Sequence, residues 1–313
     1  MKPINSVNIW IKIFCLTFGL LMQGCITDDL SECGASVYFQ YTRNLEGTDK
    51  FSPDIQKLNL FIFDSDGLFM DEYEMDEAQL GSEHLMRLNL FPGTYDLVAW
   101  GNLGGDYELP VFVRGKTSVG EVVLSLKRTG KTVSKHPGDL FFGSLFRVEI
   151  LPAIQRKQRL TIDMIKDTKK IRIIAKGLPA EEIARQKFAC RITSINGDYN
   201  FDNSINGSDR LLYIPQTSVD EQGQFISEFV IMRDLEDGST QSRLLFTYED
   251  PDDKSIKELL NAGLTQILLA NMKGQDLDIE DFFEIELLFD FTSGSAKIYI
   301  KGWQTIDTGY MVN

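Results

Sequence analysis

Histidine is scarce in this chain of 313 residues, where only His84 and His136 occur. Two histidines leave little material for zinc sites with imidazole ligands or for hydrolytic triads with a histidine base. Positive charge is also in short supply, because 32 lysines and arginines face 46 acidic residues and the formal charge is −14. Such an acidic balance argues against nucleic acid as a partner. The composition therefore favours a protein that is not an enzyme.

Motifs of common catalytic and nucleotide-binding sites are missing as well. The sequence contains no P-loop, no glycine fingerprint for dinucleotides, no Gly-x-Ser-x-Gly elbow and no helical pair of histidines. Its many carboxylates follow strand ends and turns, where solvation explains them, and no pair stands out for glycoside hydrolysis. We therefore expect no catalytic residues, and no metal site apart from one calcium candidate.

The apolar run near the N-terminus, Ile13–Met22, is too short to cross a bilayer as a helix. It follows Lys2 and Lys12 and has the length of a signal-peptide core. Gln23-Gly24-Cys25 comes directly after it and resembles a bacterial lipobox, in which the cysteine is lipidated and becomes the mature N-terminus. We expect a signal peptide over residues 1–24 and a lipidated tether over residues 25–35, the alternative being an ordinary signal peptide.

Cysteine is nearly as scarce, with four in the chain. Cys15 leaves with the signal peptide and Cys25 takes the lipid, so Cys33 and Cys190 remain. In an oxidising exterior, two remaining cysteines favour one disulfide bridge. The alternative is that either one is a buried thiol.

Short apolar runs broken by turn residues fill the chain from Ser36 onward, a pattern typical of β-sandwiches. Asp66-Gly67 and Asn196-Gly197 each predict a hairpin turn. Because single cores stop growing near about 250–300 residues, we expect two domains. The polar stretch Gln155–Arg159 predicts an exposed linker, which divides the mature chain into domains at 36–158 and 159–313. Apolar residues at helical spacing predict one amphipathic helix over Ser255–Asn271.

Oxygen-bearing side chains alternate in the second half at Asp198, Asn200, Asp202 and Asn206. A glycine follows at the sixth position of a loop that starts at Asp202, as in an EF-hand, but the twelfth position is Tyr213 instead of glutamate. The segment is therefore either a weak calcium site or a turn rich in Asn, Asp and Gly.

Two tryptophans of the mature chain, Trp100 and Trp303, bear on glycan binding, which needs exposed aromatic side chains. Both lie in apolar strand patterns. We expect them in the core, and an exposed position in a groove would favour a glycan-binding surface lipoprotein instead.

Several segments together resemble the fimbrillin-associated anchor family of Bacteroidetes, lipoproteins that hold major and minor fimbriae to the outer membrane. They are Phe91-Pro92-Gly93-Thr94-Tyr95, Val98-Ala99-Trp100-Gly101-Asn102, Leu140-Phe141-Phe142-Gly143 and Gly302-Trp303. Thr27-Asp28-Asp29, close to Cys25, also resembles the surface-export signal of Bacteroidetes lipoproteins.

The resemblance implies an all-β fold of two transthyretin-like β-sandwich domains in tandem, to which the expected helix adds an elaboration. It also implies a basal fimbrial subunit that joins a shaft subunit by strand exchange, with no cofactor besides the lipid. Its place would be the outer membrane, facing outward at the base of the fimbrium. A shaft or tip subunit is the alternative within the family.

Overall fold

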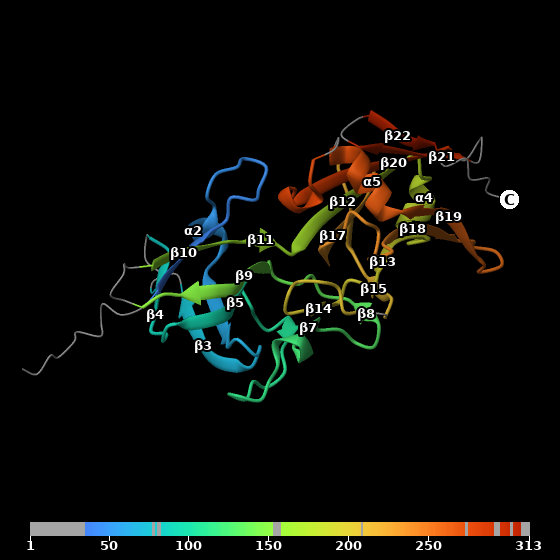
Figure 1. The fold of residues 1–313 in the computed structure, drawn as a ribbon. Coiled ribbons are helices and arrows are strands. Elements are labelled where there is room, and N and C mark those ends of the chain that lie inside the picture. The colour runs from blue at the N-terminus through green and yellow to red at the C-terminus, as the bar shows by residue number, and fades with distance from the viewer. Residues whose placement is uncertain are drawn as a thin grey trace, which may run out of the picture.

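The computed structural model describes residues 35–76, 79, 83–152, 158–207, 209–272, 275–290, 295–300 and 303–307. The expected signal peptide, Cys25, Cys33 and most of the expected linker lie outside these residues. Strands dominate the described part, which confirms the expected all-β class (Figure 1). None of the described helices is long and apolar enough to cross a membrane.

The N-terminal half is a sandwich of two sheets, at the left of Figure 1. Its three-stranded sheet has the order β10-β1-β4, and its five-stranded sheet has the order β11-β9-β5-β2-β3. The strands are β1 (Ala35–Gln40), β2 (Lys57–Phe63), β3 (Phe69–Asp76), β4 (Leu85–Leu88), β5 (Gly93–Gly101), β9 (Phe141–Ile150), β10 (Gln158–Asp163) and β11 (Ile165–Lys166).

Strand β2 of the five-stranded sheet is buried on both faces, which explains why it reads as a nearly continuous apolar run. Leu60 and Ile62 point into the core between the two N-terminal sheets. Phe61 and Phe63, on the opposite face, belong to a second core that extends into the C-terminal half. A strand covered on both sides has no polar alternation.

The C-terminal half is a second sandwich. Its six-stranded sheet has the order β16-β17-β12-β20-β21-β22, and its five-stranded sheet has the order β19-β18-β13-β15-β8. The strands are β8 (Thr132–Val133), β12 (Thr168–Lys176), β13 (Phe188–Ser194), β15 (Leu211–Tyr213), β16 (Gln216–Val219), β17 (Phe225–Met232), β18 (Arg243–Glu249), β19 (Ile256–Gly263), β20 (Phe282–Asp290), β21 (Ser295–Ile300) and β22 (Trp303–Asp307).

The two halves exchange strands. β8 comes from the N-terminal half of the sequence but pairs in parallel with β15. A third sheet has the order β14-β7-β6 and joins β6 (Tyr107–Glu108) and β7 (Val123–Leu126) to β14 (Asp198–Asn200) of the C-terminal half. This sheet brings Phe201 against Phe61, Phe63 and Trp100, so one aromatic cluster belongs to both halves.

The expected domain boundary near residue 158 does not coincide with the point at which the chain passes from one sandwich to the other. β10 starts there, yet it runs parallel to β1 in the first sandwich, with Gln158 opposite Ala35. β11 then pairs with β9. The chain passes into the second sandwich at Asp167, between β11 and β12.

The prediction of one helix over Ser255–Asn271 is wrong in its first half. Residues Ile256–Gly263 form β19, and only Leu264–Met272 form a helix, α5. A β-bulge in the β18–β19 pair, between Phe246 and Thr247 of β18, buries the consecutive residues Leu259 and Leu260, which imitates helical spacing. The other described helices are short: α2 (Phe51–Asp54), α4 (Ala180–Ala184), η2 (Val119–Glu121) and η3 (Leu277–Ile279).

The two predicted hairpins have opposite outcomes. Asp66-Gly67 joins the paired strands β2 and β3, and Gly67 adopts φ +74°, as a tight turn requires. Asn196-Gly197 joins no hairpin, because β13 and β14 belong to different sheets.

Candidate functional site

One edge of the C-terminal sandwich is left open along β13. The strand pairs with β18 over its residues Phe188–Thr193, but with β15 only from Ile192 to Ser194. After β15 the chain leaves this sheet and forms β16 at the edge of the other sheet. Within β13, the residues Ala189, Cys190 and Arg191 therefore have a strand partner on one side only.

The backbone of this open stretch points into the gap. The Glu249 amide donates to the Lys187 carbonyl at 2.8 Å, so the odd-numbered residues of β13 bond to β18. Because the groups of successive residues point to opposite sides of an antiparallel strand, those of Phe188 and Cys190 face away from β18. Pro215 lies two residues after the end of β15. A proline has no N–H group, so it cannot extend the hydrogen bonds between β15 and β13.

A groove of about 590 Å³ occupies the gap between β13 and β16. Its lining is mixed: apolar side chains such as Ile214 and Val219 alternate with polar ones, which include Gln186, Thr217 and Ser218. Val219 is apolar and yet 53% exposed. Arg191 is the one charged side chain among the lining residues. The groove thus has room for an added strand, with a strand edge along one side.

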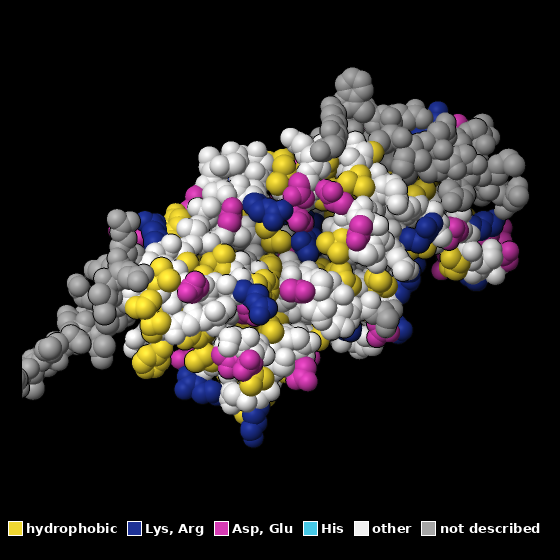
Figure 2. All heavy atoms as spheres, viewed as in Figure 1, with side chains coloured by type: hydrophobic (Ala, Val, Ile, Leu, Met, Phe, Trp, Pro, Cys, Tyr) yellow, Lys and Arg dark blue, Asp and Glu magenta, His cyan; other side chains and the backbone are white. Residues whose placement is uncertain are grey.

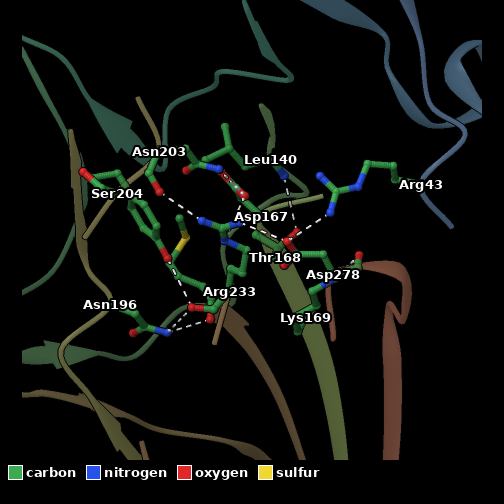
Figure 3. Close-up of polar contacts among 12 residues, drawn as sticks. Arg43, Leu140, Asp167, Thr168, Lys169, Asn196, Asn203, Ser204, Arg233 and Asp278 are labelled. Atoms are coloured by element: carbon green, nitrogen blue, oxygen red, sulfur yellow. Dashed lines mark hydrogen bonds and ion pairs between the residues drawn. The ribbon is translucent and has the colours of Figure 1, made fainter. Parts of the chain in front are cut away.

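A buried polar cluster lies where the chain crosses between the two sandwiches (Figure 3). Asp278 stands between Arg43, which comes from the N-terminal half, and Arg233 of the C-terminal half. Its Oδ2 lies 3.6 Å from Arg43 Nη2 and 3.2 Å from Arg233 Nη1. The Lys169 ammonium donates to the Asp278 carbonyl at 2.9 Å. The cluster therefore connects the two halves by charge.

Asp167, at the crossing point, is fully buried in this cluster. Its Oδ1 accepts from Asn203 Nδ2 at 3.0 Å and lies 3.5 Å from Arg233 Nε. Burial raises the pKa of the Asp167 carboxyl to about 6, although Arg233 and Asn203 act in the opposite direction. Burial likewise lowers the pKa of the Lys169 ammonium, against the charges of Asp281 and Asp278. Because the charged groups of this cluster are largely buried and pair with one another, we interpret the cluster as a structural joint between the two halves.

The expected disulfide involves one described cysteine. Cys190 is a free thiol buried in the core, and burial raises its pKa to about 12. Cys33 lies outside the described residues. A bridge would have to reach a thiol enclosed in the second sandwich, and the pairing stays a prediction.

The calcium candidate residues bind protein groups. Both oxygens of Asp198 accept from the Arg128 guanidinium, at 2.9 and 2.8 Å. Asn200 Oδ1 accepts from Asn206 Nδ2, and Asp202 Oδ1 accepts from the backbone and hydroxyl of Ser204. Among the described residues no group of three or more His, Cys, Asp or Glu side chains is arranged to hold a metal ion. These contacts fit the alternative of a polar turn, whereas calcium binding stays an expectation.

One of the two tryptophans whose exposure would favour glycan binding is buried. Trp100 is fully enclosed and packs against Phe142, which confirms its expected place in the core. The side chain of Trp303 lies outside what the structure describes.

A family model for the fimbrillin-A associated anchor proteins Mfa1 and Mfa2 matches residues 30–309. The chain belongs to this family. It is 23% identical over 294 residues to the minor fimbrium anchoring subunit Mfa2 of Porphyromonas gingivalis, which covers 89% of this chain and 87% of that protein. It is 27% identical over 174 residues to the major fimbrium anchoring subunit FimB of the same species, with 53% of this chain and 55% of that protein covered.

The fold of the family is also seen directly in a solved structure. The fimbrial anchor protein Mfa2 of Porphyromonas gingivalis matches with a TM-score of 0.73 at 20% identity, over 88% of this chain and 99% of that chain. The sequence resemblance to the fimbrillin-associated anchor family is confirmed.

Neither the groove nor the polar cluster of this anchor-family chain was predicted from its sequence. The open edge depends on where β15 stops pairing, which no local pattern reveals. Pro215 was the one available signal, because a proline directly after a short strand ends its ladder. The polar cluster brings together Arg43, Asp167, Arg233 and Asp278, which are far apart in the sequence.

Proposed function

We propose that this protein is the basal subunit that anchors a fimbrium to the outside of the cell. The observation that carries the proposal is the family match over residues 30–309, together with relatives named as anchoring subunits of the minor and major fimbrium. The protein then needs two attachments, one to the outer membrane and one to a fimbrial shaft subunit. It needs no catalytic residue.

The membrane attachment is a covalent lipid on Cys25, with Asp28 and Asp29 directing the anchor to the outward-facing leaflet. The several acyl chains of a lipoprotein cysteine hold a protein stably, at roughly 0.8 kcal/mol per buried CH₂. β1 begins at Ala35, so only a short tether separates the lipid from the first sandwich.

The attachment to the shaft is strand addition in the groove between β13 and β16. An extended segment of the neighbouring subunit pairs with the backbone of β13 beside Cys190, and its alternate side chains enter the groove. Exposed edges of this kind are ones that sheet proteins normally cover. The added strand covers the edge and completes the sheet.

The lipid is tested by Cys25→Ala in cells that lack the native gene, with Cys33→Ala as a matched control from the same tether. We expect Cys25→Ala to move the protein from the membrane fraction into the medium and to cause shedding of fimbriae, seen by electron microscopy. Cys33→Ala should leave both unchanged. Retention of Cys25→Ala in the membrane with normal fimbriae would refute the lipid anchor.

The groove is tested by Val219→Arg, which places a long charged side chain at its rim. Ile256→Arg is the matched control, because Ile256 is 64% exposed on the edge strand β19, outside the groove. We expect Val219→Arg to reduce the shaft subunit that co-purifies with the anchor, and Ile256→Arg to leave it unchanged. Equal co-purification with both variants would exclude this groove as the acceptor.

A further inference from the structure

Five strand ends meet at one end of the N-terminal sandwich. Ala35 opens β1 and lies opposite Leu88, the last residue of β4, and opposite Gln158, the first residue of β10. In the other sheet Gly93, which opens β5, lies opposite Ile150, which closes β9. The side-chain amide of Gln158 (Nε2) donates to the Glu149 carbonyl at 2.7 Å, so the two sheets are joined at this end. We call it the tether end, because the chain enters the sandwich here.

The tether end displays apolar side chains to solvent. Phe91, in the β4–β5 loop, is 85% exposed, and Leu151, directly after β9, is 42% exposed. Both backbones are fixed: the Tyr95 hydroxyl donates to the Phe91 carbonyl at 2.9 Å, and the Leu151 amide donates to Gln158 Oε1 at 3.1 Å. Figure 2 shows hydrophobic side chains gathered over this left end of the molecule. A large aromatic held outward by its own loop indicates an apolar contact.

Three exposed arginines lie on strands that begin or end at the tether end. Arg87 and Arg159 both lie opposite Ser36 at the start of β1, and Arg147 precedes the end of β9 by three residues. Acidic residues lie at the same end: Glu149 is exposed on β9, and Asp64 and Asp71 line a pocket together with Phe91. Exposed apolar side chains with arginines on the neighbouring strands suit the surface of an anionic bilayer, where each basic residue contributes about 1 kcal/mol.

The tether limits how far this end can lie from the membrane. Ten Cα–Cα steps lead from Cys25 to Ala35, a span of at most about 35 Å for a fully extended chain and about 18 Å for a flexible coil. The distance argument rests on the proposed lipid at Cys25. The tether end is therefore the part of the described structure that lies nearest the bilayer.

We propose that the tether end is a membrane-contacting face. Phe91 and Leu151 enter the headgroup region of the bilayer, and Arg87, Arg147 and Arg159 bind anionic headgroups around them. The face holds the first sandwich against the membrane in one orientation, so that the C-terminal groove is presented away from it.

The test uses the mature chain with Cys25→Ala, which carries no lipid, in flotation assays with vesicles. One set contains phosphatidylethanolamine with phosphatidylglycerol, and the other contains phosphatidylcholine alone. We expect binding to the anionic vesicles that is several-fold stronger and that weakens with salt. Phe91→Ser with Leu151→Ser should reduce it about tenfold, and Arg87→Gln with Arg147→Gln and Arg159→Gln should abolish its salt dependence.

The matched control is Val219→Ser with Ile256→Ser, which removes two exposed apolar residues from the C-terminal half and should leave vesicle binding unchanged. Equal thermal unfolding of all variants shows that they are folded. Binding that is absent, or that survives in the Phe91→Ser and Leu151→Ser variant, would overturn the proposal. Such a result leaves the lipid anchor standing, because release of Cys25→Ala from cells is measured independently.

Discussion

The N-terminal sandwich closes its inner core with its own residues, whereas the C-terminal sandwich is completed by the other half. The inner core of the first half draws on residues from Ala35 to Met164. The second core runs from Phe61 to Phe289 and includes side chains of both halves. β7 and β8 reach across to pair with β14 and β15. Because of this asymmetry, a force on the second sandwich is passed to the first through strands and a shared core, not through a flexible linker.

The surfaces of the two halves differ in a parallel way. The first half displays side chains on loops, with Phe91 and Leu151 at the tether end. The second half leaves one side of β13 without a strand partner at residues 189–191. Side chains on loops suit contact with a surface such as a bilayer, and open backbone suits contact with a strand. This difference is in line with the two proposals, in which the first half contacts the membrane and the second half binds the fimbrial neighbour.

The largest expected effect comes from the aromatic cluster that both halves share. Phe201→Ala should lower the free energy of unfolding by about 3–5 kcal/mol, because a buried aromatic is removed from contact with Phe61, Phe63 and Trp100. Hydrogen exchange should then rise in both halves. Phe39→Ala, in the inner core of the first half, should raise exchange mainly there. Exchange confined to one half in both variants would show that the halves are not coupled.

The next effect concerns the polar joint. Arg233→Met should cost about 3 kcal/mol of unfolding free energy, because it leaves Asp167 buried without its ion-pair partner. Arg172→Met is the control, since Arg172 pairs with Glu228 and Glu284 at the surface and should cost less than about 1 kcal/mol. Urea unfolding measures both. Equal costs would mean that the joint does not stabilise the protein.

The sequence predicted local features of this fold better than its long-range pairing. The strand Leu58–Phe63 and the turn at Asp66-Gly67 follow from local apolar runs and turn chemistry, and both are present. The expected helix over Ser255–Asn271 failed because a β-bulge buries two consecutive leucines. The Asn196-Gly197 hairpin failed because β14 pairs with β7, about 75 residues earlier in the chain. Register and partner are set by such distant contacts.

The same difference between local features and long-range contacts applies to the candidate sites. The tether end contains Phe91, whose Pro-Gly loop was recognised in the sequence, but its exposure could not be read from a pattern of apolar residues. The groove depends on an absence of strand pairing beside Cys190, and such an absence leaves no mark in the sequence. The burial of Asp167 could not be predicted, because nothing in the neighbouring sequence indicates that it pairs with Arg233 in the interior.

Acidity should act on the joint through Asp167. Its pKa in the folded protein is raised to about 6 by burial, against about 3.9 in an unfolded chain. Between these values the folded state keeps a proton that the unfolded state has lost, so the contribution to stability is full below about pH 4 and is lost as the pH rises through 6. Relative to Asp167→Asn, the native protein should lose about 2–3 kcal/mol of unfolding free energy between about pH 4 and pH 7.

Urea unfolding at several pH values checks this trend, with Asp237→Asn as the control. The pKa of exposed Asp237 is lowered, chiefly by its hydrogen bond to Ser239, so its contribution runs in the opposite direction and is lost as the pH falls. A pH trend of the same sign for both substitutions would exclude Asp167 as the source.

The smallest effects on stability should come from the two surfaces themselves. Phe91→Ser and Val219→Ser should each change the unfolding free energy by less than about 0.5 kcal/mol, because the two side chains are 85% and 53% exposed. Phe91→Ser should weaken vesicle binding without affecting the shaft subunit, and Val219→Ser should do the reverse. A loss above about 1 kcal/mol in either variant would mean that the side chain packs within the fold. Opposite effects of the two substitutions would show that the two proposed contacts are separate, one made by side chains of the first half and the other by a strand edge of the second.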